Sequence, residues 1–437
     1  MPLRLPLLAA GLLFVSFAAA APAPKTAGFD WPAFRGPNRD GVSKETGLLK
    51  EWPKEGPPVA WTVKGLGLGF GTPTVAKGMI FGMGTRDGKD GIWALAEADG
   101  KELWFTPFDD PRTLQPPQNN GPSASPTYDD GKVFAVSSKG KLVGLDAAKG
   151  DKLWERDYVK DFGGKVPTWG FTDSVLIDGD KLVCVPGGAT AAIVALDKKT
   201  GKDIWKSEIA GGGGNGGGYC SPQKVTLAGK PMIVVLMGKS AGLVGVDSET
   251  GKLLWDYKGK AAGGGTAQIP IPIVTGDSVW VSCAYDGGSA LLQIAADGTE
   301  KFAAKEVKAY KKLELCNHHG GMVQIDDYAY FGHNQNDGKP VCVDLKRGDI
   351  KWGPERASPA GGGGSAAVLV ADGRLYFRYD NGTVVLIEPS PEKLKVVSSF
   401  KEAERSGKQC WPHPVIANGK LYLRDQDKLT CYDVKAK

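Results

Sequence analysis

The chain has 437 residues, of which 54 are Lys or Arg and 49 are Asp or Glu, so its formal net charge is +5. Charged residues make up 24% and hydrophobic residues 41%, a balance typical of soluble globular proteins. The aromatic content of 9% argues against disorder. So small a charge over this length also argues against a nucleic-acid partner.

Residues 1–20 have the organisation of a secretory signal peptide. Arg4 supplies the charged start, Leu5 to Phe17 form an apolar run, and small residues follow at 18–20. The run is shorter than the ~20 residues that a membrane-spanning helix needs, and no later segment is long and apolar enough to span. We therefore expect an exported chain without a membrane span, soluble in the periplasm or cell envelope after cleavage.

One motif recurs along the chain, in which Asp is followed by Gly four residues later and by Trp after four more. The copies are Asp146-Gly150-Trp154, Asp197-Gly201-Trp205, Asp247-Gly251-Trp255 and Asp344-Gly348-Trp352. Upstream of each copy, short apolar segments alternate with Gly/Asp turns. These units start at Pro73, Pro126, Val175, Pro222, Pro272, Met322, Val368 and Pro414, in steps of 46 to 53 residues.

Eight units of this length, each with four strand-like segments, predict an all-β fold: an eight-bladed β-propeller of four-stranded antiparallel blades. In each motif the Gly would take the tight turn between the third and fourth strands. The Trp would project from the outer strand and pack between neighbouring blades. We expect this structural role for Trp61, Trp104, Trp154, Trp205, Trp255 and Trp352.

The two ends of the chain predict how the ring closes. The last unit stops at Cys431-Tyr432-Asp433, before an outer strand. The segment 58–61, which ends on Trp61, has no third strand of its own. We expect this N-terminal strand to pair with the C-terminal blade, which gives a propeller at 58–437 and an N-terminal arm at 21–57.

The repeat resembles that of a known family. The sequence Ala195–Trp205, ALDKKTGKDIW, is similar to the tryptophan-docking motif of pyrroloquinoline-quinone (PQQ)-type propeller repeats. The start Trp31–Gly41, WPAFRGPNRDG, resembles the opening of an exported bacterial subfamily of PQQ-like repeat proteins. The resemblance extends over nearly the whole mature chain and implies the same propeller fold.

Two groups share this repeat: the quinoprotein alcohol and glucose dehydrogenases, and the cofactor-free propeller lipoprotein of the outer-membrane β-barrel assembly machinery. Quinoprotein alcohol dehydrogenases stack the quinone on a disulfide of two adjacent cysteines, and none of the seven cysteines here are adjacent. The lipoprotein carries a lipidated Cys, which this sequence lacks at the cleavage point. The resemblance therefore implies the fold, and neither function carries over residue by residue.

Several polar and aromatic residues fall outside the repeat pattern and map to loops at one end of the predicted channel. They are His318, His319, His333, Arg378, His413, Arg424, Asp425, Trp169 and Trp411. Such a set would suit a polar or anionic ligand. His319, His333 and His413 are also candidate ligands for a transition metal. The alternative is that these residues hydrogen-bond to one another and stabilise a channel rim.

Three functions remain open from the sequence. The first, which we favour, is a non-catalytic exported propeller that binds an envelope protein, a polymer or a small polar ligand. The second is a dehydrogenase of alcohols or sugars that uses PQQ with a divalent metal such as calcium. The third is a hydrolase or lyase acting at the histidines, although no nucleophile is paired with them in the sequence.

Overall fold

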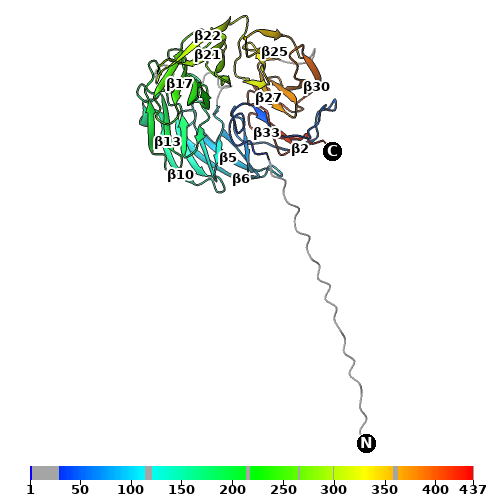
Figure 1. The fold of residues 1–437 in the computed structure, drawn as a ribbon. Helices are drawn as coiled ribbons and strands as arrows, with labels where there is room; N and C mark the ends of the chain where they lie inside the picture. Colours follow the sequence, from blue (N-terminus) through cyan, green and yellow to red (C-terminus); the bar gives the residue numbers. More distant parts are fainter. Residues whose placement is uncertain are drawn as a thin grey trace.

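The computed structural model describes residues 1, 29–113, 121–212, 217–263, 266–298, 300–357 and 363–436. Apart from Met1, the expected signal peptide at 1–20 lies outside the described residues. The strands form eight sheets around a ring, each with four antiparallel strands, and the short strand β1 (Val42–Ser43) adds a fifth, parallel strand to one of them (Figure 1). The predicted eight-bladed propeller is therefore confirmed.

The blades follow one another along the chain, and each runs from its innermost to its outermost strand. Blades one and two contain β3 (Thr74–Ala76), β4 (Met79–Arg86), β5 (Lys89–Ala96), β6 (Glu102–Asp109), β7 (Thr127–Asp129), β8 (Lys132–Val136), β9 (Lys141–Asp146) and β10 (Lys152–Asp157), with the short helix α1 (Tyr158–Phe162) after β10. Blades three and four contain β11 (Leu176–Asp178), β12 (Lys181–Cys184), β13 (Ile193–Asp197), β14 (Asp203–Ser207), β15 (Gln223–Leu227), β16 (Lys230–Leu236), β17 (Leu243–Asp247) and β18 (Leu253–Tyr257).

The second half of the ring repeats this order and ends on a blade built from both ends of the chain. Blades five and six contain β19 (Ile273–Thr275), β20 (Ser278–Cys283), β21 (Gly288–Ala296), β22 (Phe302–Lys311), β23 (Met322–Ile325), β24 (Tyr328–His333), β25 (Lys339–Asp344) and β26 (Ile350–Trp352). Blades seven and eight contain β27 (Ala366–Ala371), β28 (Arg374–Tyr379), β29 (Thr383–Glu388), β30 (Lys395–Lys401), β31 (Val415–Ala417), β32 (Lys420–Asp425), β33 (Lys428–Asp433) and β2 (Val59–Val63).

The ring closes as the sequence predicts. Strand β2 pairs antiparallel with β33, with Val59 opposite Tyr432 and Trp61 opposite Cys431. Figure 1 shows the two labels side by side. Because every blade then packs against two neighbours, blade faces that would be exposed in an open array are buried.

The repeated turn has a clear local cause, illustrated by the copy at the end of β13. The Asp197 carboxylate accepts hydrogen bonds from the Lys199 and Thr200 backbone N–H groups. Gly201 then takes φ +70°, a left-handed conformation that favours glycine. The Trp154 ring of the preceding blade packs against this glycine, and a Cβ there would lie 2.8 Å from the ring.

The tryptophans join consecutive blades through these glycines. Trp154 Nε1 donates to the Lys198 carbonyl oxygen of the next blade at 3.1 Å. A Cβ at Gly100, Gly150 or Gly251 would likewise lie 2.8, 2.7 or 2.5 Å from the ring of Trp61, Trp104 or Trp205 of the preceding blade. Trp352 Nε1 donates across to Ser390 at 2.7 Å. Trp255 differs, because its Nε1 faces the Met232 sulfur of its own blade at 3.2 Å.

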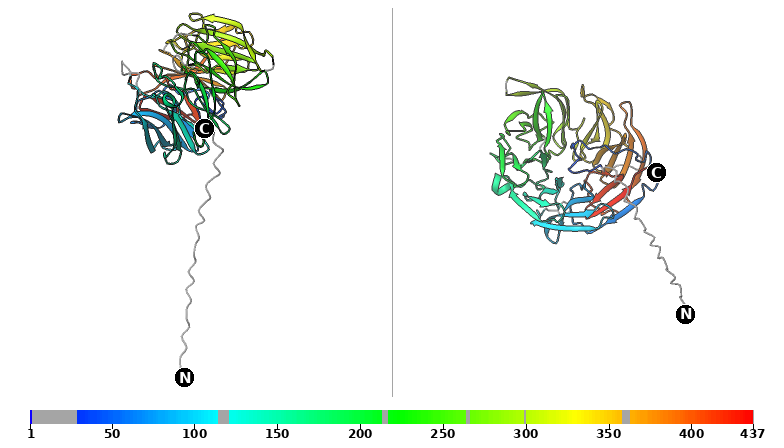
Figure 2. Two further views of the ribbon diagram at one scale, coloured as in Figure 1. Left: turned by 90° about the vertical axis from the view of Figure 1, so that its left-hand side faces the viewer. Right: turned by 60° about the horizontal axis from the view of Figure 1, so that its bottom comes forward.

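The N-terminal arm lies across the inside of the ring. Its residues contact the innermost strands: Trp31 N–H donates to the Val75 carbonyl oxygen of β3, and β1 (Val42–Ser43) pairs in parallel with β27. In the right-hand view of Figure 2 the blue segment crosses the interior of the ring. The arm therefore closes the central channel on one side of the cavity described next.

Candidate functional site

A cavity of about 330 Å³ occupies one mouth of the central channel and is bounded on its inner side by the arm residue Phe34. Its walls are the loops that lead into the innermost strands, here called approach loops, and the loops between second and third strands. The arm contributes one lining residue, Phe34, whose ring lies edge-on against His413 with centroids 5.1 Å apart. This volume is at the lower end of the ~300–1,000 Å³ typical of ligand pockets.

Four hydroxyls form a belt around half of this mouth, one at the end of each of four consecutive approach loops. Each oxygen accepts a backbone N–H from the preceding blade: His413 to Thr72 at 2.9 Å, Thr72 to Ser125 at 3.0 Å, Ser125 to Ser174 at 2.9 Å, and Ser174 to Ser221 at 2.9 Å. Among the described residues, none of the four hydroxyls donates to a protein acceptor, so each keeps its hydrogen for another partner. Thr72, Ser174 and Ser221 line the cavity, whereas Ser125 does not.

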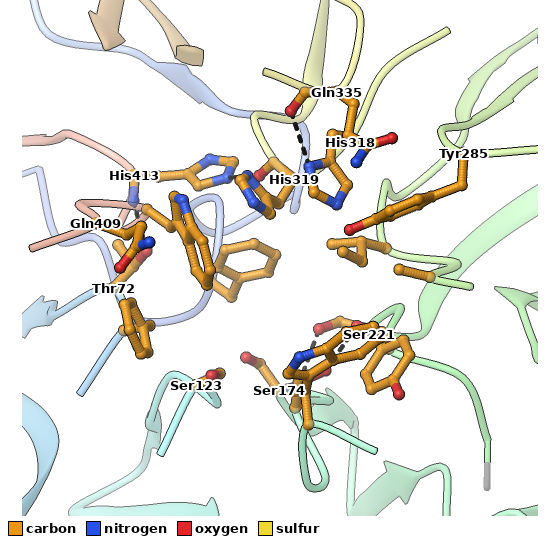
Figure 3. Close-up of a pocket in the computed structure, with 18 of the residues that line it drawn as sticks. Thr72, Ser123, Ser174, Ser221, Tyr285, His318, His319, Gln335, Gln409 and His413 are labelled. Atoms are coloured by element: carbon orange, nitrogen blue, oxygen red, sulfur yellow. Dashed lines mark hydrogen bonds between the residues drawn. The ribbon is translucent and has the colours of Figure 1, made fainter. Parts of the chain in front are cut away.

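Three histidines form the opposite side of the cavity, facing Ser174 and Ser221 (Figure 3). His318 Nδ1 lies 3.0 Å from the Gln335 carbonyl oxygen, and His413 Nε2 lies 2.9 Å from that of His319. A carbonyl oxygen only accepts, so these nitrogens carry the hydrogen and the other nitrogen of each neutral ring is an acceptor. His319 Nε2 is buried and has no hydrogen-bond partner among the described residues.

Burial keeps all three rings neutral. It lowers the pKa of His318 to about 4. Burial and, secondarily, the Arg35 guanidinium lower the pKa of His413 to about 3. His319 is buried beside both other rings, which holds its pKa well below the usual range. At neutral pH this side of the cavity therefore carries no charge.

Aromatic faces complete the lining. The His318 and His319 rings stack with centroids 3.8 Å apart, and His319 lies 4.5 Å from Trp411. Trp411 in turn stacks on Phe70 at 4.8 Å. At the other end of this series, Tyr285 meets His318 edge-on at 5.0 Å. Together these rings form one continuous wall that can pack against a ligand.

Trp169 lines the cavity on another side. It lies in the approach loop of blade three, and its ring centroid is 5.6 Å from that of Tyr219. The structure thus brings five of the nine residues singled out in the sequence to one cavity. They are His318, His319, His413, Trp169 and Trp411.

The charged residues singled out in the sequence do not line this cavity. Arg378 is buried and makes a two-pronged ion pair with Glu402, at 2.9 Å for both bonds. Arg424 donates to the carbonyl oxygens of Gln426 at 2.9 Å and Gly71 at 3.0 Å. These contacts tie neighbouring blades and loops together.

Asp425 and His333 also form hydrogen bonds with residues around the channel mouth. Asp425 accepts from Arg405 Nε at 3.0 Å and from the Ser406 hydroxyl at 2.7 Å. His333 Nδ1 accepts from the Cys316 backbone N–H at 3.2 Å. Neither lines the cavity.

The three proposed metal ligands are not assembled as a site. In the part of the chain that the structure describes, no group of three or more His, Cys, Asp or Glu side chains is placed to hold a metal ion. His319 and His413 share the cavity, but His333 binds the Cys316 backbone instead.

Sequence reasoning missed the hydroxyl belt, although a signal was present. Thr72, Ser125 and Ser221 each stand directly before the proline that starts a blade, and Ser174 stands before the equivalent Val175. Aligning the eight unit starts would have revealed this recurrent hydroxyl. Phe70 and Tyr285 carried no such signal, because their loops differ in length from blade to blade.

The described residues contain no helix long and apolar enough to cross a membrane. Comparison with known families identifies the fold family of the chain. The model of the family described as outer membrane protein assembly factor BamB matches residues 24–165 and 89–354.

Curated relatives align over short stretches. Quinohemoprotein alcohol dehydrogenase ADH IIB of Pseudomonas putida is 29% identical over 107 residues, which is 24% of this chain and 14% of that protein. Outer membrane protein assembly factor BamB of Burkholderia pseudomallei is 27% identical over 119 residues, which is 27% of this chain and 28% of that protein. These alignments therefore span well under two thirds of either relative.

Solved structures match over most of the chain. Quinohemoprotein alcohol dehydrogenase from Comamonas testosteroni has a TM-score of 0.65 and 14% identity, covering 93% of this chain and 81% of that one. A likeness at this identity establishes the shared fold, and the function has to be inferred from the residues of the site.

Proposed function

The chain belongs to the family of PQQ-type propellers described as outer membrane protein assembly factor BamB, and from this premise we propose that it is a binding protein rather than a quinone-dependent enzyme. Its channel-mouth cavity takes a small, uncharged, polar ligand. The propeller is the rigid scaffold that holds this site.

The observation that carries the proposal is the chemistry of the lining. Among the described residues, the cavity is lined by aromatic, hydroxyl, amide and imidazole groups, without a Lys, Arg, Asp or Glu side chain. A charged ligand would lose its hydration there and gain no opposite charge in return, which costs several kcal/mol. An uncharged ligand with hydrogen-bonding groups does not incur this cost.

The lining does not fit PQQ with calcium. PQQ is a tricarboxylate, and the nearby guanidinium groups of Arg378 and Arg424 are already paired with Glu402 and with backbone carbonyls. Calcium requires several oxygen ligands, usually carboxylates, and no described carboxylate lines the cavity. All seven cysteines are buried, and none lines the cavity. We therefore derive no step through the quinone.

An envelope location is part of the same proposal. It is supported by the signal-like organisation of residues 1–20 and by the family description, which refers to outer-membrane protein assembly. A protein or polymer of the envelope would then bind the propeller as a second partner, close to the small ligand.

The test is a binding comparison on the purified mature chain. Equilibrium dialysis with PQQ and calcium chloride should leave no quinone on the protein. A library of uncharged polar fragments, screened by thermal shift, should yield ligands that stabilise the wild type. The same fragments should lose their effect on the Trp411→Ala variant, since Trp411 is a partly exposed wall residue. Stoichiometric PQQ retention with alcohol-dependent dye reduction would contradict the proposal.

A further inference from the structure

We propose that the ligand of the channel-mouth cavity is a neutral saccharide unit, either free or at the end of a glycan chain. This inference rests on the proposed function and narrows it to one chemical class. Three independent features of the lining lead to it: the direction of its hydrogen bonds, its aromatic wall and its lack of charge.

The hydrogen-bonding groups of the cavity demand a ligand that both donates and accepts. On one side, the hydroxyls of Thr72, Ser174 and Ser221 already accept a backbone N–H, so each has a hydrogen left to donate. On the other side, His318 and His413 use one nitrogen as a donor to a carbonyl and keep the other as an acceptor. Ser174 and Ser221 face the histidines across the cavity, and Thr72 lies beside His413, whose backbone N–H it accepts (Figure 3).

A saccharide hydroxyl satisfies both sides, because it donates and accepts at once. A ligand with only carbonyl groups could accept from the belt but would leave the histidine acceptors without a partner. His319 Nε2, buried and unpartnered among the described residues, adds a further polar atom that the protein itself does not satisfy.

The aromatic wall suits the other surface of a sugar ring. The C–H groups of a pyranose carry small positive charges, and the face of an aromatic ring is negative. Trp411, Phe70 and the stacked histidines offer such faces beside the hydrogen-bonding groups. An aromatic wall with polar groups at its margin is thus complementary to a ring with one C–H face and hydroxyls around its edge.

The uncharged lining selects among saccharides. With no described Lys, Arg, Asp or Glu on the wall, a uronic acid or sugar phosphate would be desolvated without compensation. A cavity of about 330 Å³ has room for a mono- or disaccharide. The binding unit is therefore small and neutral, and any further sugars of a glycan would have to lie outside the cavity.

The experiment is isothermal titration calorimetry near pH 7.5 on the full mature chain, followed by variants of the belt. The probes are glucose, N-acetylglucosamine, maltose and cellobiose, with glucuronate and glucose 6-phosphate as charged counterparts. At least one neutral sugar should bind, and its charged counterpart should bind at least about tenfold more weakly. Equal or tighter binding of the charged sugar would overturn the inference.

Belt variants locate the site with a matched control. Ser174→Ala and Ser221→Ala should each weaken saccharide binding by about five- to tenfold, the loss expected for one hydrogen bond. Ser125→Ala removes a belt hydroxyl of the same kind that does not line the cavity, and it should leave binding unchanged. Thermal unfolding of all three should shift alike, since each loses one equivalent backbone contact. A Ser125→Ala variant that binds as weakly as Ser174→Ala would overturn the inference.

Two further comparisons distinguish a free sugar from one on a glycan chain, and failure of the saccharide inference from failure of the proposed function. Retention of the chain on amylose or chitin beads would identify a chain-borne unit. Binding of a soluble disaccharide without retention would identify a free one, and either result supports the inference. If uncharged fragments bind in a Ser174-dependent manner while no saccharide does, the saccharide inference falls and the proposed function stands. If PQQ with calcium binds instead, both fall.

Discussion

Replacing Arg39 with alanine should destabilise the whole ring through the arm. Arg39 is buried inside the channel, where Nη1 donates to the Ser174 carbonyl oxygen at 2.8 Å and to that of Pro222 at 3.1 Å. Nη2 donates to the Val175 carbonyl oxygen. One side chain thus joins the arm to the residues that directly precede the innermost strands of blades three and four, beside the hydroxyl belt.

The magnitude follows from two opposing quantities. Three hydrogen bonds from a charged donor contribute about 1.5–3 kcal/mol each, or about 5–9 kcal/mol together. Burial opposes them and lowers the pKa of Arg39 to about 10, a net shift that corresponds to roughly 3 kcal/mol against the charged form. The difference predicts that Arg39→Ala lowers the free energy of unfolding by about 2–6 kcal/mol.

The assay is urea and thermal unfolding followed by tryptophan fluorescence. Arg347→Ala is the control, because it removes the same charge from a side chain that is 71% exposed, and it should cost under about 1 kcal/mol. Limited proteolysis within the arm should also accelerate in Arg39→Ala alone. An Arg39→Ala variant that unfolds within about 0.5 kcal/mol of the wild type would refute the reasoning.

Three other predictions test different parts of the account. Gly201→Ala should unfold at a clearly lower temperature than Gly179→Ala. Both glycines have positive φ, but only at Gly201 would the added Cβ meet the Trp154 ring. Equal losses of stability would argue against the packing of Trp154 on Gly201. Trp61→Ala should lower stability by about 2–3 kcal/mol, less than the ~3–5 kcal/mol of a fully buried Trp because the ring is half-buried. The loss is expected because Trp61 packs on Gly100 and lies in the closing strand. A smaller loss than for the exposed Leu153→Ala in the same assay would contradict the closure argument. The free energy of unfolding should fall as pH drops from about 6.5 toward 4, because His318 and His413 bind protons in the unfolded chain but stay neutral in the fold. The expected loss is about 1.4 kcal/mol per pH unit for each histidine.

A buried carboxyl opposes this loss of stability at acid pH. Burial raises the pKa of Asp173 to about 6, so this carboxyl binds a proton in the fold before it would in the unfolded chain, and it stabilises the fold as pH falls from about 6 toward 4. His413→Gln keeps a donor for the His319 carbonyl oxygen and should flatten the acid limb, as measured by unfolding temperature between about pH 4.5 and 7.5. A variant whose acid limb is as steep as that of the wild type would count against a neutral His413.

The sequence predicted the fold because the repeat encodes local geometry. Asp197 and Gly201 build one turn within five residues, and the Trp eight residues after the Asp meets a glycine at a fixed position in the next blade. Ring closure followed from the absence of an outer strand after Tyr432 and the presence of a spare one at Trp61. Each inference needed only the spacing of residues along the chain.

The site was predictable in its position but not in its charge. Arg378 and Asp425 occur at the channel end of the second strands, as the spacing implies, yet Glu402 and Arg405 neutralise them from the segment that leads into blade eight. That segment is the approach loop of blade eight, and its sequence does not follow those of the other approach loops, so its conformation could not be inferred from spacing. The sequence therefore left both a polar and an anionic ligand open, whereas the described lining of the folded cavity carries no charged side chain.

The histidines illustrate the same limit. Neighbouring side chains on an extended chain point to opposite sides, but the turn at His318 and His319 brings both rings into one stack. His333, at the end of β24, binds the Cys316 backbone instead of joining them. The conformation of two irregular loops, the approach loops of blades six and eight, decides which of the four histidines lie together.

The central claim is that the cavity wall is uncharged at neutral pH, and the protonation of its histidines tests this directly. The chain has only four histidines, so ¹⁵N-labelled rings give few signals, which His→Gln variants can assign. The account predicts that His318, His319 and His413 remain neutral from about pH 8 to about pH 5, with the hydrogen on Nδ1 of His318 and on Nε2 of His413. Protonation of any of these three rings with a midpoint near pH 6.5 would contradict it.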